Sequence, residues 1–380
     1  MGRVARFFRR AILISAALVV TAPFIRAADW NRGVAYYKNS EYGRALVEFQ
    51  DIVREHPDVA GAWYYIGLCQ FKLTRYKQVQ PPMSRAIDLL EAQSPGSADI
   101  DGAWYTIGFS YFALGDYEKT IEPLKRYVEL ASGAKRPVDL AAQRALGRSY
   151  FYLERYDDAL PLLSVTRQSS ETAADATTAG AQAKDKSQDA FYVGAIYYRR
   201  GDDDHAIEAL DRALGSAPAD PAVLDMLASS LMRKANANGS KAYWLRAAEV
   251  GEKLQQARDD LKSAEVLGRA YLGTGNFEKA VTPLEKIAKS RPDDGQAWMY
   301  YGIALSRSGM SRKAMEALEM SVQLAPDLVP ALNELGYVYE SDKQYQQALR
   351  AYEKAYAAGG STNTAVKQSI DRVRALASEH

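Results

Sequence analysis

The chain has 380 residues, with 48 Lys+Arg against 47 Asp+Glu and a formal net charge of +1. This balance gives no support for a protein that coats nucleic acid, because such a protein shows a basic excess. The single cysteine, Cys69, excludes an intramolecular disulfide framework and a cysteine-built zinc or iron–sulfur site. The length favours two or three domains, unless the chain is a repeat array that grows in one dimension.

Residues 1–27 have the pattern of a secretory signal peptide. The first ten residues hold four arginines and no acid, and an apolar run from Ala11 to Ile25 ends in a short Arg-Ala-Ala segment. A helix of that length spans only about 22 Å, less than the ~30 Å hydrocarbon core of a bilayer. We therefore expect a cleavable signal peptide, with an uncleaved N-terminal anchor as the alternative, and a protein exported to the periplasm or cell envelope of a bacterium.

Without residues 1–27 the charge of the chain changes sign. The leader carries five arginines, so residues 28–380 hold 43 basic and 47 acidic side chains, a net charge of −4. The exported protein is therefore expected to be mildly acidic. We expect Cys69, an unpaired thiol in an apolar helical stretch, to be buried.

A period of 34 residues organises the rest of the chain. Apolar residues recur at i, i+3, i+4 and i+7, which is one face of an α-helix. Four of the eight steps between aligned small residues are 34 residues long, and the others are longer, as expected when insertions fall in loops. The aligned positions are Gly33, Gly67, Gly108, Gly147, Gly194, Ala228, Gly268, Gly302 and Gly336.

These units resemble the tetratricopeptide repeat family, whose pattern reads W-x2-L-G-x2-Y, then A-x3-F, then P. Trp104-x2-Ile107-Gly108-x2-Tyr111 matches the first part, and segments such as Ala45-x3-Phe49 match the second. The resemblance runs in phase through the whole chain after the leader. It implies an all-α fold, a right-handed superhelical solenoid of about nine helix-turn-helix units with a C-terminal capping helix.

The period also sets the expected domain organisation. We expect the repeat solenoid over 28–362 and a capping helix over 363–380, whose apolar positions are Val366, Ile370, Val373 and Leu376. The nine units are placed at 26–59, 60–100, 101–139, 140–186, 187–220, 221–260, 261–294, 295–328 and 329–362.

Two insertions interrupt the period. Residues 164–186 are poor in large apolar side chains, and we predict a flexible insertion there, with a solvated helix extension as the alternative. The sixth unit has Ala228 in place of glycine and a second insertion around Asn236-Ala237-Asn238-Gly239. We expect this insertion to precede a long second helix from Lys241 to Ala257.

A search for catalytic and metal-binding patterns finds none that fits. The cluster Asp202-Asp203-Asp204-His205 lacks the spaced oxygens of a calcium loop, and it lies at the turn between two predicted helices. We predict that its acids cap the next helix. No zinc-protease, serine-hydrolase or phosphate-loop motif is present. We therefore expect no enzyme activity, no cofactor and no metal site.

In proteins that this chain resembles, the first helices of successive units line a concave groove. That mapping places aromatic and arginine side chains on the groove of the first five units. Exposed aromatics with arginine are typical of binding hot spots, although such rings also pack against each other in a narrow groove. The predicted partner-binding residues are Tyr64, Phe71, Tyr105, Phe109, Phe112, Arg144, Arg148, Phe151, Tyr152, Phe191, Tyr198 and Arg199.

The sequence thus predicts a non-catalytic interaction scaffold of the cell envelope that binds a peptide or protein partner in the groove of its first five repeats. The alternative is a polysaccharide- or glycan-binding protein of the envelope or of secretion assembly, because aromatic rings also stack on sugar faces. No nucleic-acid partner is expected, and membrane contact is expected only through an uncleaved leader. A homo-oligomeric state stays open.

Overall fold

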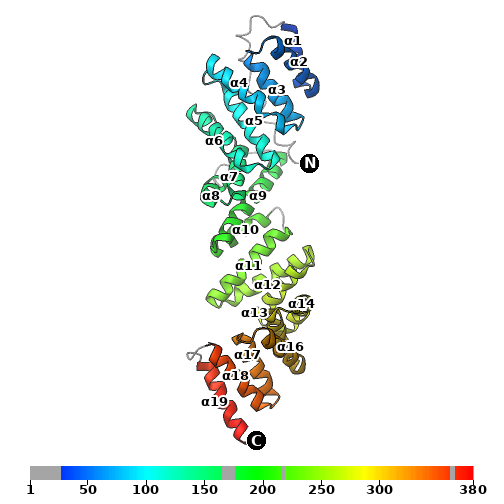
Figure 1. The fold of residues 1–380 in the computed structure, drawn as a ribbon, viewed down its shortest axis with the longest axis vertical. Coiled ribbons are helices and arrows are strands. Elements are labelled where there is room, and N and C mark those ends of the chain that lie inside the picture. The colour runs from blue at the N-terminus through cyan, green and yellow to red at the C-terminus, as the bar shows by residue number, and fades with distance from the viewer. Residues whose placement is uncertain (1–26, 165–175, 216–218, 360–363, 380) are drawn as a thin grey trace. The chain divides into compact units, whose positions relative to one another are not determined.

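The computed structural model describes residues 27–164, 176–215, 219–359 and 364–379. These residues form helices and no strands (Figure 1). One short 3-10 helix, η3, covers Tyr76–Gln78. The α-helices are α1 (Ala27–Lys38), α2 (Tyr42–Glu55), α3 (Ala60–Lys72), α4 (Gln80–Gln93), α5 (Ala98–Leu114), α6 (Tyr117–Gly133), α7 (Leu140–Tyr152), α8 (Tyr156–Ser164), α9 (Ala176–Arg200), α10 (Asp203–Leu214), α11 (Pro221–Asn238), α12 (Lys241–Ala257), α13 (Leu261–Thr274), α14 (Phe277–Ser290), α15 (Gly295–Arg307), α16 (Ser311–Leu324), α17 (Val329–Ser341), α18 (Tyr345–Gly359) and α19 (Thr364–Glu379).

The chain divides into two compact units. Unit 1 runs to Ile196, within α9, and unit 2 starts at Tyr197. In each unit, helices that follow one another in the sequence pack side by side as pairs, such as α5 with α6 in unit 1 and α15 with α16 in unit 2 (Figure 1). The predicted fold class is confirmed, because each unit is an α-solenoid built from helix pairs.

The two helices of a pair approach closely at a glycine. A Cβ atom on Gly108 of α5 would lie 2.4 Å from Cδ2 of Leu124 of α6, so close that the Leu124 side chain or the helices would have to shift. In unit 2, a Cβ atom on Gly268 would lie 2.7 Å from Cδ2 of Leu284. In both cases the leucine follows the glycine by sixteen residues. The period of small residues therefore records the spacing at which two helix backbones meet.

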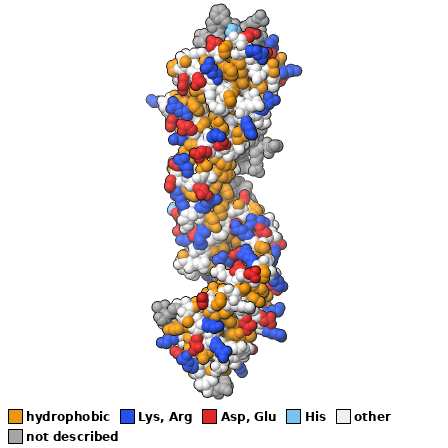
Figure 2. All heavy atoms as spheres, in the orientation of Figure 1, with side chains coloured by type: hydrophobic (Ala, Val, Ile, Leu, Met, Phe, Trp, Pro, Cys, Tyr) orange, Lys and Arg blue, Asp and Glu red, His pale blue; other side chains and the backbone are white. Residues whose placement is uncertain are grey.

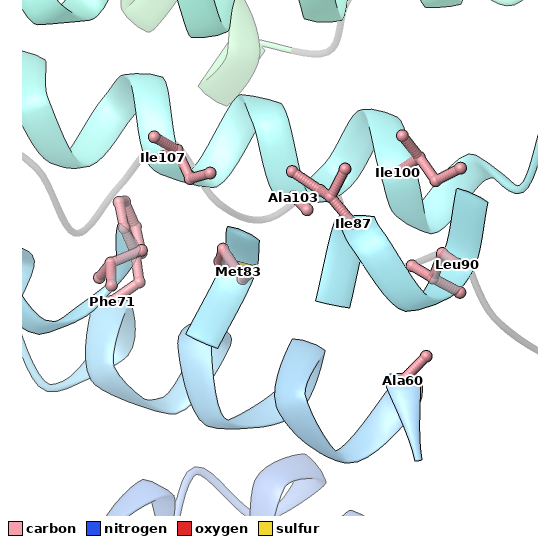
Figure 3. Packing of buried hydrophobic residues seen from close by; sticks show 9 residues of the cluster. Ala60, Phe71, Met83, Ile87, Leu90, Ile100, Ala103 and Ile107 are labelled. Atoms are coloured by element: carbon pink, nitrogen blue, oxygen red, sulfur yellow. The ribbon is translucent and has the colours of Figure 1, made fainter. Parts of the chain in front are cut away.

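The core runs between the helices as a series of apolar layers. In unit 1, α3, α4 and α5 enclose one such layer, in which Ile87 of α4 lies next to α5 beside Ala103 (Figure 3). Met83 and Ala103 are fully buried, and Ile107 is 2% exposed. Burial of apolar area between neighbouring pairs is the main stabilising contribution, because no helix can bury its apolar face alone.

Turn chemistry fixes where the helices of a pair begin and end. Gly115 ends α5 with φ of 74°, and the Asp116 side chain then accepts a hydrogen bond from the backbone N–H of Lys119 in the first turn of α6. Asp202 caps α10 in the same way, accepting from the backbone N–H of His205 at 3.3 Å. The capping role predicted for the acidic cluster is confirmed for Asp202, whereas Asp203 and Asp204 form ion pairs with Arg233 and Lys234.

The structure differs from the sequence prediction at one insertion. Residues 176–186, assigned to a flexible loop over 164–186, instead form the first turns of α9, so the helical alternative is correct for them. The reason is local, since this stretch is rich in alanine, the best helix former. Residues 165–175 of that insertion, and the predicted signal peptide up to residue 26, lie outside the described residues.

Two other regions agree with the predicted helices. The second helix of the sixth pair, α12, covers Lys241–Ala257 as predicted. At the C-terminal end, α19 buries Val366, Ile370 and Val373, and the Arg372 guanidinium donates to both carboxylate oxygens of Glu340 on α17 at 2.7 and 2.9 Å. Among the described helices, none combines the length and the apolar character needed to cross a membrane.

The reactivity of the Cys69 thiol can be used to test the packing in unit 1, because this thiol is buried. Cys69 is fully buried, and this burial raises the pKa of its thiol to about 12. An unfolded cysteine ionises near pH 8.5, so the folded state loses relative stability as the pH rises above that value. In buffer at pH 8, we expect a disulfide reagent to modify Cys69 only as fast as the protein unfolds and exposes the thiol. In urea, the same reaction should be complete within seconds.

A matched control uses an exposed position close to Cys69 in the sequence. Thr74 is exposed, so a Cys69→Ser, Thr74→Cys variant should react within seconds without urea. Equal rates for the two thiols in the folded protein would contradict the burial of Cys69.

Candidate functional site

A continuous run of aromatic rings crosses unit 1 from α5 to α7. Ring centroids lie 4.5 Å apart for Tyr105 and Phe109, 6.4 Å for Phe109 and Phe112, and 6.0 Å for Phe112 and Tyr117. Tyr117 then stacks on Tyr152 at 4.3 Å, with the ring planes 12° apart. We name these five residues the aromatic surface. Tyr152 is 47% exposed, and the other four are half-buried.

The hydroxyl of Tyr152 is hydrogen-bonded to a second tyrosine, Tyr192. The two hydroxyls lie 3.0 Å apart, and Tyr192, on α9, is 6% exposed. Burial and the neighbouring Tyr152 hydroxyl raise the pKa of Tyr192. The Arg148 guanidinium lies 5.2 Å from the centre of the Tyr192 ring, within the range of a cation–π contact. The exposed ring of Tyr152 is thereby held in one orientation.

The two arginines predicted to contact a partner are already paired inside the protein. Arg144 Nε donates to Asp189 Oδ2 at 2.6 Å, and Arg148 Nη2 donates to Asp189 Oδ1 at 2.9 Å. The three side chains are 14%, 13% and 2% exposed, respectively. Arg144 and Arg148, predicted to contact a partner, therefore neutralise a buried carboxylate of their own chain and are themselves largely buried.

The remaining predicted residues of unit 1 divide between surface and core. Phe71 and Phe151, which were predicted to contact a partner, are 5% and 8% exposed, so they lie in the core and present little area to a partner. The 3-10 helix η3 places the Tyr76 ring against Phe71 at 5.4 Å, and Phe151 packs on Tyr192 at 5.0 Å. Phe191 is half-buried beside Tyr192.

Two tyrosines of the predicted site hold their hydroxyls against polar groups of unit 1. Tyr105 donates to Asp139 Oδ2 at 3.2 Å, and burial together with this carboxylate raises the pKa of Tyr105. Tyr64 is half-buried, and burial followed by the nearby carboxylate of Asp99 raises its pKa as well. Both phenols therefore stay protonated at any physiological pH and serve as neutral contacts.

Tyr198 and Arg199, the last two predicted residues, belong to unit 2. Tyr198 is half-buried with the Arg233 guanidinium 4.4 Å from its ring centre, and Arg199 is exposed. The structure thus brings the half-buried aromatic residues of α5 together with the exposed Tyr152 of α7, but assigns Tyr198 and Arg199 to a different unit.

Three contributing residues were not singled out from the sequence. Tyr117 opens the second helix of its pair, and Tyr192 and Asp189 act through α9. The prediction considered only positions on the first helix of each pair, so it could not include Tyr117, which lies on a second helix. Tyr192 directly follows Phe191, which was predicted.

The arrangement offers contact area and hydrogen-bonding groups to a ligand. Among the residues that the structure describes, no cluster of three or more His, Cys, Asp or Glu side chains could hold a metal ion. Figure 2 shows basic and acidic side chains interspersed with hydrophobic ones on the face in view. Partly exposed tyrosine and phenylalanine rings held in fixed positions are suited to binding because little rotamer freedom is lost on contact.

The fold defines an α-helical repeat protein with a row of partly exposed aromatic rings. Tetratricopeptide repeat models match residues 31–78, 99–172, 144–221, 266–329 and 329–358, and the chain belongs to the tetratricopeptide repeat family. Its repeats are of a kind that serves protein–protein interaction.

Solved structures with a similar fold include MamA proteins. The structure of MamA from Desulfovibrio magneticus RS-1, from residue 41 to the end, is 20% identical to this chain in sequence. The match covers 47% of this chain and 98% of that chain, with a TM-score of 0.41. MamA of MSR-1 is 22% identical, with 46% and 97% covered and a TM-score of 0.41. No curated protein matches this chain.

Proposed function

We propose that the protein is a non-catalytic scaffold of the bacterial cell envelope that binds a protein or peptide partner on the concave face of its first five repeats. One observation carries the proposal, which is the unbroken ring contact from Tyr105 to the exposed Tyr152. The signal-like sequence of residues 1–27 supports the location in the envelope.

The partner contacts are assigned to the aromatic surface and not to the arginines beneath it. Arg144 and Arg148 act by holding Asp189 and Tyr192, so they determine the position of Tyr152 from below. A flat, partly apolar peptide segment would cover the rings of Phe109 and Phe112 and would stack on Tyr152. This surface provides area and shape, with no uncompensated charge of its own.

Removal of one of these rings should weaken partner binding strongly. Substitution Phe109→Ala or Tyr152→Ala should raise the Kd by about 30-fold, since a hot-spot aromatic contributes roughly 2 kcal/mol to binding. The measurement is quantitative capture of envelope proteins on the immobilised exported chain, followed by titration of the retained partner.

Tyr337 supplies a matched control for Tyr152. It is 45% exposed, close to the 47% of Tyr152, but lies on α17 in unit 2. Tyr337→Ala should leave the Kd of the same partner within twofold. Equal Kd values for the wild type and folded Tyr152→Ala and Phe109→Ala variants would overturn the assignment. Fractionation and N-terminal sequencing of the protein from cells test the location separately.

A further inference from the structure

The turns that join the two helices of each pair in unit 1 differ sharply in charge. Residues 38–44, at the junction of α1 and α2, hold two basic side chains and one acidic side chain. Residues 72–78, at the junction of α3 and η3, hold three basic side chains and no acid, so these two turns together have a net charge of +4. The next two turns, residues 113–119 and 152–158, hold two basic and five acidic side chains, a net charge of −3.

The two basic turns have the same local structure. In each of them an aromatic ring at the end of the first helix packs edge-on against a tyrosine five residues later. The ring centroids lie 5.3 Å apart for Tyr37 and Tyr42, and 5.4 Å apart for Phe71 and Tyr76. The third residue after each first ring has left-handed backbone, with φ of 64° and 59°. The ring contact therefore holds both turns in one conformation and fixes the backbone that carries the basic side chains.

The two basic turns also lie next to each other in unit 1. Tyr37, which precedes the first turn, and Leu73, within the second, pack against one buried cluster that includes Leu46 and Cys69. Tyr37 also contacts the Tyr65 ring of α3, with a centroid distance of 5.2 Å. The bases of both turns therefore belong to one surface. We name this surface the basic edge, which consists of Lys38, Arg44, Lys72, Arg75 and Lys77.

The positive charge of the basic edge is not neutralised within the protein. Lys38, Arg75 and Lys77 are exposed, and none of them forms an ion pair with a residue that the structure describes. Arg44 pairs with Glu41 at 2.7 Å, but these side chains are 71% and 38% exposed, and an exposed pair of this kind is weak. The basic edge is thus a local positive charge on a chain whose residues 28–380 have a net charge of −4.

The chemistry of the basic edge fits an anionic phospholipid surface. Bases that are spread over two turns can each approach a different headgroup, and this attraction requires no hollow in the protein. Tyr42, Leu73 and Tyr76 alternate with the bases along the sequence and are half-buried. A tyrosine ring combines an apolar body with a polar hydroxyl, and such side chains are enriched at the boundary between membrane and water.

We propose that the basic edge holds the protein against an anionic phospholipid membrane, independently of any contact through residues 1–26. Lys38, Arg75 and Lys77 pair with lipid phosphates, and the rings of Tyr42 and Tyr76 lie at the level of the headgroups. The same membrane repels the acidic turns at 113–119 and 152–158. The basic edge shares no residue with the aromatic surface, so the proposal does not rest on the function proposed above.

The test is flotation of the chain from Ala27 onward with vesicles of phosphatidylcholine alone or of equal parts of phosphatidylcholine and the anionic phosphatidylglycerol. This chain contains every described residue and lacks the arginine-rich leader, which would itself attract anionic lipid. One base near an anionic surface contributes about fivefold to binding, so the wild type should prefer the anionic vesicles by at least about 100-fold. Added NaCl should weaken that binding.

The variant that combines Lys38→Gln, Arg75→Gln and Lys77→Gln should lose about 100-fold in affinity for the anionic vesicles. A charge-preserving variant with Lys38→Arg, Arg75→Lys and Lys77→Arg should keep the wild-type affinity, because the attraction depends on charge. Circular dichroism confirms that each variant is folded before its affinity is compared.

The matched control combines Lys343→Gln, Arg350→Gln and Lys354→Gln in unit 2. These three side chains are also exposed and form no ion pair within the described part of the chain, and their substitution removes the same net charge. This variant should bind the anionic vesicles like the wild type. Equal losses in the two glutamine variants, or equal binding of the wild type to both kinds of vesicle, would overturn the proposal.

Soluble glycerol phosphate distinguishes a membrane surface from a site for one phosphate group. An excess of it should leave most of the protein on the anionic vesicles, and complete displacement would contradict the proposal. Tyr152→Ala should not change vesicle binding, so a failure of the aromatic surface and a failure of the basic edge can be told apart.

Discussion

Substitution Gly108→Val is expected to lower the free energy of unfolding by about 3 kcal/mol, as insertion of extra atoms into a packed helix contact does. The new side chain would start 2.4 Å from Cδ2 and 2.6 Å from Cγ of the fully buried Leu124. Leu124 cannot move away, because it is enclosed in the core, so α5 and α6 must separate. Urea unfolding followed by circular dichroism measures the effect as a lower midpoint.

The control is the same substitution at a glycine with free space. Gly43 lies in the first turn of α2, and a Cβ atom there would meet nothing within 4 Å. Gly43→Val should change the free energy of unfolding by less than about 0.5 kcal/mol, as expected for a surface position. If the two variants unfold at the same urea concentration, close helix approach at Gly108 is not what the repeat glycine provides.

The second large effect is expected at Asp189. Substitution Asp189→Asn should destabilise unit 1 by about 3 kcal/mol, because it leaves the largely buried guanidiniums of Arg144 and Arg148 without their shared carboxylate. The loss should also release Tyr192 and, through its hydroxyl contact, Tyr152. Urea unfolding gives the energy, and partner titration should show weaker binding even though Asp189 touches no partner.

Asp51→Asn provides the comparison for an exposed ion pair. Asp51 is 53% exposed and pairs with Arg54, three residues later on α2. Its substitution should cost less than about 0.5 kcal/mol. A double-mutant cycle of Asp189→Asn with Arg148→Gln should give a coupling energy of at least about 1 kcal/mol. Additive effects in that cycle would contradict a direct pairing.

The helical pairs could be predicted because each one repeats the same local chemistry. An apolar stripe, a small residue at the helix contact and a capped turn specify a helix pair without any distant information. The helix Lys241–Ala257 was predicted correctly in this way. The loop predicted over 164–186 was wrong for residues 176–186, because the scarcity of large apolar residues was weighed above the helix propensity of alanine.

The candidate site was only partly predictable. Tyr105, Phe109 and Phe112 could be placed on one surface from their spacing along α5. Tyr117 could not, because it lies on the second helix of its pair and joins the aromatic surface through its contacts with Phe112 and with Tyr152 of the next pair.

The sequence by itself determined the repeat, the helix pairs and the face on which ligand contacts were to be sought, because each follows from residues within one 34-residue unit. Only the tertiary structure decided which charges are neutralised and which rings are exposed. Arg144 and Arg148 show why, since their carboxylate lies 45 and 41 residues further along the chain. A contact between two repeats is made by packing, and the residue spacing within one 34-residue repeat does not specify it.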